Sequence, residues 1–128
     1  MDLWLALEWV GRVVFVTFFI MAGVNHLRNT KAIAGYAASK GVPAATAGAV
    51  VTGLMLLGGG IMILVRWHPI VGAALLIVFL LAAAFKIHNY WTLTDPMMRA
   101  GDQAQFWKNI TLAGAALLYA VAHHRGAL

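Results

Sequence analysis

The feature that most constrains this chain is the run of residues 44–65, which contains no charged side chain. A helix needs about 20 apolar residues to cross the hydrocarbon core of a bilayer, so this run is long enough to span a membrane. Three further apolar runs cover residues 3–24, 70–87 and 106–122. Only 10% of all residues are charged, whereas soluble domains carry about 25%. We therefore expect an all-α integral membrane protein with one domain over residues 1–128.

The connections between these runs predict the arrangement of the helices. The link at residues 66–69 is short, which makes the second and third helices an antiparallel pair, and four spans predict an up-down-up-down bundle. We expect short interfacial helices in loop one (residues 25–43) and loop three (residues 88–105). Asp95 followed by Pro96 is typical of a helix start. Asp102, with Gln105 three residues later, predicts the start of the fourth helix.

The first apolar run is expected to be a retained helix and not a cleaved signal peptide. A signal peptide begins with a basic segment, but this run carries Asp2 and Glu8 and is longer than a signal core.

Small residues follow one another at helical spacing in the second run. Ala45, Ala49 and Gly53 lie four residues apart, and Gly58–Gly60 follow further along the same run. Such a face favours close packing against a neighbouring helix. A ligand groove is the alternative interpretation.

Charge in the loops predicts the orientation of the chain. Loops one and three carry or adjoin six basic residues, and the opposite end carries two: Arg28, Lys31, Lys40, Lys86, Arg99 and Lys108 against Arg66 and Arg125. Cytoplasmic loops are enriched in Lys and Arg, so loops one and three are predicted to be cytoplasmic.

Glu8 and Arg12 are the charged residues that lie deepest in an apolar run. They are separated by one helical turn, so both lie on one face of the first helix. Ionisable groups at membrane depth are costly and often functional. One interpretation is a self-neutralising pair, and the other is an anion, headgroup or proton-path site inside the bundle.

A second polar cluster is expected where the third helix ends and the fourth begins. It contains His88, Trp91, Lys108 and Asn109, with His26, Lys86 and Asp95 as secondary candidates. These side chains offer hydrogen bonds, proton transfer and stacking, which a quinone headgroup requires. The alternative is an interfacial belt of aromatic and basic residues, common to membrane proteins.

Other chemistry is disfavoured by the residues present. The chain has no cysteine, which excludes disulfides and cysteine-ligated metal clusters. Haem ligation by His26 and His88 is disfavoured because both are expected at helix ends. His68, His123 and His124 could bind a metal, but no carboxylate except Glu8 accompanies them, and no catalytic or nucleic-acid-binding motif is present.

Several motifs together resemble the DoxX family of small four-helix bacterial membrane proteins. The resemblance covers nearly the whole chain, through Arg12, the Gly23–His26 pair, the segment YAASKGVP at residues 36–43, a glycine-rich second helix, His88 and Trp91, Asp95–Pro96, and the segment FWKNITLAG at residues 106–114. His26 stands where relatives often have Lys.

The resemblance implies a multi-pass protein of the bacterial inner membrane. Relatives are linked to quinone-dependent oxidoreductases and to redox homeostasis, and more distant ones resemble cargo receptors. The hypothesis is a membrane subunit of a quinone-linked oxidoreductase or respiratory complex, with no redox centre of its own and with partner subunits. The alternative is a non-catalytic accessory or scaffold subunit of a larger membrane complex. A permease is less favoured, because four short helices enclose little volume.

Overall fold

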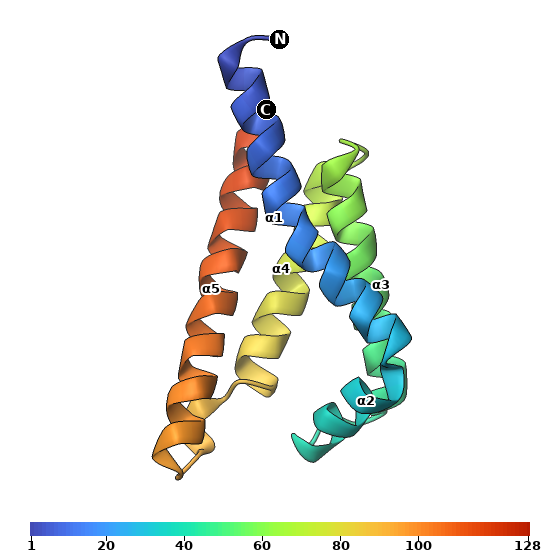
Figure 1. The fold of residues 1–128 in the computed structure, drawn as a ribbon, viewed down its shortest axis with the longest axis vertical. Coiled ribbons are helices and arrows are strands. Elements are labelled where there is room, and N and C mark those ends of the chain that lie inside the picture. The colour runs from blue at the N-terminus through green and yellow to red at the C-terminus, as the bar shows by residue number, and fades with distance from the viewer.

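The computed structural model describes residues 1–128 and contains helices and no strands (Figure 1). The helices are α1 (Leu3–Arg28), α2 (Thr30–Ser39), α3 (Ala45–Leu64), α4 (Pro69–Lys86), the single 3-10 turn η1 (Tyr90–Thr92) and α5 (Pro96–His124). α1 packs along α3, α3 against α4, and α4 against α5. Both termini lie at one end of the molecule, at the top of Figure 1, and α2 lies at the other. The expected all-α class is confirmed.

The expected count of four spans is not confirmed. Three segments are long and apolar enough to cross a membrane: α1, α3 and the stretch Pro69–Thr92 that contains α4. α5 is the longest helix, but it does not reach the same apolar composition. Its first turns carry Arg99, Asp102 and two glutamines, and Lys108 and Asn109 follow.

The beginning of α5 differs from the sequence prediction in one respect. Asp95 accepts hydrogen bonds from the backbone N–H groups of Met97 and Met98 at 3.0 and 2.9 Å, so the predicted Asp95–Pro96 start is confirmed. The second start predicted at Asp102 is wrong, because α5 runs without interruption through this residue. The carboxylate of Asp102 pairs instead with residues outside its own helix.

The predicted helices in the two long loops are present in different forms. Loop one contains α2, which packs on α3, whereas loop three contains the turn η1 and, from Pro96 on, the beginning of α5. The link between α3 and α4 is tight, as expected. Arg66 and His68 adopt left-handed backbone angles there, with φ of 59° and 46°, and Pro69 begins α4.

Close contacts between small residues hold the helices together. A Cβ atom added to Gly23 would lie 2.9 Å from the carbonyl oxygen of Gly53, and one added to Gly59 would lie 2.9 Å from that of Gly72. α1 therefore touches α3, and α3 touches α4, backbone to backbone. Van der Waals contact of this kind stabilises helix pairs in lipid, where the hydrophobic effect offers little.

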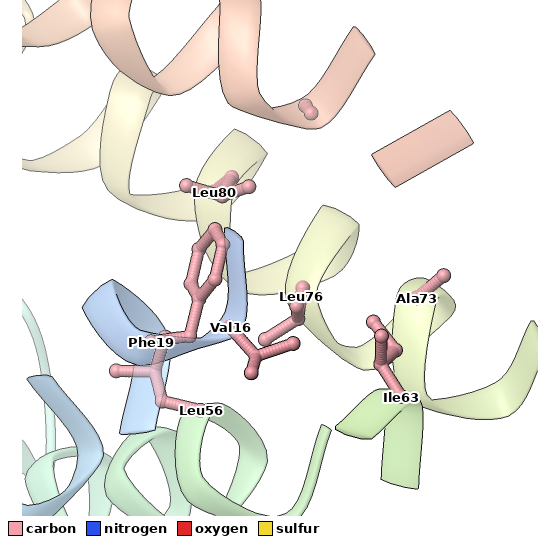
Figure 2. Packing of buried hydrophobic residues seen from close by; sticks show 8 residues of the cluster. Val16, Phe19, Leu56, Ile63, Ala73, Leu76 and Leu80 are labelled. Atoms are coloured by element: carbon pink, nitrogen blue, oxygen red, sulfur yellow. The ribbon is translucent and has the colours of Figure 1, made fainter. Parts of the chain in front are cut away.

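The central core joins all four long helices. It consists of Val16, Phe19, Leu56, Ile63, Ala73, Leu76, Leu80 and Ala113. Figure 2 shows the ring of Phe19 pointing from α1 toward Leu80 of α4. This core divides the bundle into two ends, and each end contains a separate polar group of side chains.

Candidate ligand-binding site

A cavity of about 360 Å³ lies at the α2 end of the bundle, between α1, α2, α3 and α4. Most of its wall is apolar, as is usual for small-molecule sites. Five polar side chains also line it: His26, Tyr36, Thr52, Lys86 and His88. We refer to it as the histidine cavity.

Small residues of α3 create the space. Ala45, Gly48 and Ala49 line the histidine cavity, and a Cβ atom on Gly48 would meet only Val42, at 4.0 Å. Gly53, one turn beyond Ala49, is instead packed tightly: a Cβ atom there would lie 2.9 Å from Cβ of His26. The small-residue face of α3 therefore has two roles: it packs closely against α1 at Gly53, and it leaves an open groove at Gly48.

His26 is held by a hydrogen bond across the α1–α3 contact. Its Nδ1 lies 3.0 Å from the hydroxyl oxygen of Thr52, and that hydroxyl donates its single hydrogen to the carbonyl oxygen of Gly48 at 2.7 Å. When it does so, the hydroxyl accepts from His26 and Nδ1 carries the hydrogen, which is the tautomer we assign. In the neutral ring, Nε2 is then a hydrogen-bond acceptor, and the structure contains no hydrogen bond to it.

His88 is held in the same way by a carboxylate. Its Nδ1 lies 3.4 Å from Oδ1 of Asp102. An ionised carboxylate only accepts hydrogen bonds, so Nδ1 of His88 donates and Nε2 is again left as an acceptor in the neutral ring. Two histidines from different helices thus line one apolar cavity in the same tautomer.

Asp102 also connects parts of the chain that are far apart in sequence. Its Oδ2 accepts from the ammonium group of Lys40, at the end of α2, at 3.0 Å. Burial acts to raise the pKa of the Asp102 carboxyl, but the hydrogen bonds and charges of Lys40 and His88 outweigh it, so this pKa lies below its usual value. Asp102 therefore remains ionised and fixes α2, α5 and His88 together.

The structure separates the residues that were grouped in the predicted quinone cluster. His88, His26 and Lys86 line the histidine cavity, whereas Trp91, Lys108 and Asn109 do not. The Trp91 ring packs against Phe106 with centroids 5.6 Å apart. The Lys108 ammonium group donates to Gln105 at 2.5 Å and lies 5.2 Å from the ring of Phe18 on α1. Asn109 is buried in α5, and Asp95 caps that helix.

Sequence reasoning missed four residues of this site: Tyr36, Thr52, Lys40 and Asp102. One signal was available, because the chain has only 4 acidic residues against 9 basic ones. Each carboxylate in such a chain is therefore expected to form an ion pair with a basic side chain. Asp102 lies at the end of the molecule where most basic residues lie, so an ion pair of Asp102 was the signal available in the sequence.

The second predicted polar pair lies at the opposite end of the bundle. Glu8 contacts Arg12 on its own helix and Arg66, in the α3–α4 turn, at 2.7 Å. The side chain of Arg12 is 1% exposed. The pair is therefore a buried feature of the bundle and is separate from the histidine cavity.

Comparison with known proteins gives the family. The family model described as DoxX matches residues 7–89. The chain belongs to the DoxX family. Its similarity extends to the inner membrane protein YphA of Escherichia coli (strain K12), with 30% identity over 112 residues, which covers 88% of this chain and 79% of the relative. No solved structure matches the chain.

The match to the DoxX family includes every residue that lines the histidine cavity, from His26 to His88. Asp102, which orients His88, lies beyond the matched residues. With three helices apolar enough to cross a bilayer, the chain is a DoxX-family membrane protein in contact with lipid.

Proposed function

We propose that this DoxX-family protein is a membrane subunit of a quinone-linked oxidoreductase and that it binds quinol in the histidine cavity. The observation that carries the proposal is that His26 and His88, from different parts of the chain, line one apolar cavity and are each held through Nδ1. A quinol ring is flat and apolar with a hydroxyl at each end. It requires apolar walls and two acceptors, which the cavity offers.

The histidine tautomers favour the reduced form of the ligand. Neutral Nε2 atoms accept hydrogen bonds from hydroxyl groups but cannot donate to the carbonyl groups of a quinone. When bound, a quinol supplies two electrons and two protons. In the proposal, His26 and His88 accept the protons, and the carboxylate of Asp102, 3.4 Å from Nδ1 of His88, stabilises the positive charge that His88 then carries. Tyr36 and Lys86 add hydroxyl and ammonium donors to the wall.

The electrons would pass to a redox centre on a partner subunit. This chain has no cysteine and so provides no ligands for an iron–sulfur cluster of the usual kind. The proposal therefore includes partner subunits in a larger membrane complex.

The proposed setting is the bacterial inner membrane, with α5 as a fourth span. The relative YphA is named as an inner membrane protein, and α5 packs along α4. A fourth crossing also agrees with the two termini lying at one end of the molecule (Figure 1). The histidine cavity would then open near the cytoplasmic surface, where the basic residues gather.

Filling the cavity tests the proposal. Gly48→Leu places a side chain in the histidine cavity, and Gly58→Leu is the matched control, because nothing lies within 4 Å of a Cβ atom there. Radiolabelled decylubiquinol and menadiol would be titrated onto the purified full chain in mild detergent. We expect saturable binding in the wild type and the control, and none in Gly48→Leu. His88→Ala should weaken binding by about 1–3 kcal/mol, the usual cost of a lost buried hydrogen-bond partner.

Binding that is unchanged in Gly48→Leu, or absent in the wild type, would contradict the proposal. Partner subunits that copurify stoichiometrically with a chain unable to bind quinol would favour the accessory role instead.

A further inference from the structure

A second cavity, of about 230 Å³, lies at the opposite end of the bundle between α1, α3 and α5. Phe15, Ile63, Ala115 and Leu128 form its apolar wall, and Glu8, Arg12 and Tyr119 are its polar side chains. The histidine cavity shares no lining residue with it. We refer to it as the arginine cavity.

The guanidinium group of Arg12 is only partly paired. Nη2 contacts Glu8, but Nε and Nη1 are buried without a hydrogen-bond partner. The ring of Trp9 lies 4.6 Å from the guanidinium carbon and covers one face. A face contact of this kind leaves the N–H groups in the guanidinium plane unsatisfied. Arg stays charged in proteins, so these donors require an acceptor inside the cavity.

Tyr119 provides a third donor in the same cavity. Its hydroxyl is buried and also has no partner. The stacked ring of His123, with centroids 6.3 Å apart, supports the position of the Tyr119 ring. Hydrogen-bond donors from two helices, α1 and α5, therefore line the same small cavity.

Glu8 compensates the charge of Arg12 only in part, because its carboxylate is shared with Arg66. Leu128, the last residue of the sequence, also lines the cavity, but no ion pair joins its carboxylate to Arg12. Arg66 is partly exposed and can be solvated, whereas Arg12 is buried. A buried charge is stable only when it is paired. The partner that the space and charge require is small, singly charged and able to accept several hydrogen bonds.

We propose that the arginine cavity binds a small monovalent anion, of the size of chloride or nitrate. Nε and Nη1 of Arg12 and the hydroxyl of Tyr119 donate to it. The inference does not depend on quinol binding at the other end of the bundle.

The test is uptake of radiolabelled chloride by the purified full chain in gluconate buffer, measured by scintillation proximity. We expect saturable binding that nitrate displaces. Tyr119→Phe removes only the hydroxyl and should weaken chloride binding about tenfold, as expected for one lost hydrogen bond to a charged group. Tyr90→Phe is the control at the other end of the bundle and should leave binding unchanged.

A second pair of variants separates the site from general surface charge. Arg12→Gln should abolish chloride uptake, whereas Arg125→Gln, beyond the end of α5, should not. Gly48→Leu should also bind chloride normally, since it fills only the histidine cavity. The proposal is overturned if the wild type shows no saturable uptake, which would leave water as the occupant. It is equally overturned if Tyr119→Phe and the wild type bind chloride with the same affinity.

Discussion

The contact between α3 and α4 gives a quantitative prediction about stability. A Cβ atom on Gly59 would lie 2.9 Å from the carbonyl oxygen of Gly72 and 3.0 Å from Cδ2 of Leu76. Ordinary van der Waals contact requires at least 3.4 Å, and the carbonyl group belongs to the backbone of α4. Gly59→Ala therefore has to push the two helices apart. Overpacking of this kind costs about 1–3 kcal/mol.

Gly58 provides an internal reference for this cost. Both glycines lie inside α3, so replacing either by Ala brings the same gain in helix propensity, about 0.5–1 kcal/mol. A Cβ atom on Gly58 meets nothing within 4 Å. The difference between the two variants therefore isolates the steric cost at Gly59.

The assay is reversible unfolding of the full chain in mixed micelles with increasing dodecyl sulfate, followed by circular dichroism. Gly59→Ala should be less stable than Gly58→Ala by about 1–3 kcal/mol, which is a factor of about 5–150 in the unfolding equilibrium. Equal stability of the two variants would refute the backbone contact between α3 and α4.

Two further predictions concern the α2 end of the bundle. The pKa of Asp102 is lower in the folded chain than its unfolded value of about 3.8, because the carboxylate pairs with Lys40 and His88. The stability that this pairing contributes is fully present above the unfolded pKa and is lost as the pH falls through the lower folded pKa. Unfolding measured from pH 7 to pH 3 should show a larger acid-dependent loss of stability in the wild type than in Asp102→Asn, and identical profiles would contradict the role of the carboxylate. The chain has no cysteine, so single cysteines at Lys31 and Arg125 can report topology: an impermeant maleimide applied to intact cells should label the second and not the first, and the reverse pattern would invert the proposed orientation.

The positions of the helices could be predicted from the sequence because the patterns that indicate a helix lie within a short stretch of the chain. Runs of apolar residues define α1, α3 and α4, and the Asp95–Pro96 pair defines the beginning of α5 within two neighbouring residues. The prediction at Asp102 failed for the opposite reason. Its partner Lys40 lies 62 residues away, and no local pattern distinguishes a capping carboxylate from one that pairs across the bundle.

The site was predictable only in part. His26 and His88 were expected at the same end of the molecule, since each ends a helix that runs in the same direction. Whether they share a cavity depends on how closely α1 and α4 approach α3, which Gly53 and Gly59 decide through contacts of a few ångströms. Lys108 was grouped with His88 because α4 and α5 are neighbours, but a helix presents side chains in all directions, and Lys108 turns toward Phe18 on α1.

Native mass spectrometry of the full chain, extracted from bacterial membranes in mild detergent, tests quinol binding in the histidine cavity most directly. The wild type and Gly58→Leu should each retain an adduct with the mass of a membrane quinone or quinol, and Gly48→Leu should lack it. The adduct should persist in Arg12→Gln, since that variant alters only the arginine cavity. A wild-type chain without any quinone adduct, or an adduct of equal abundance on Gly48→Leu, would contradict the assignment of this cavity as the quinol site.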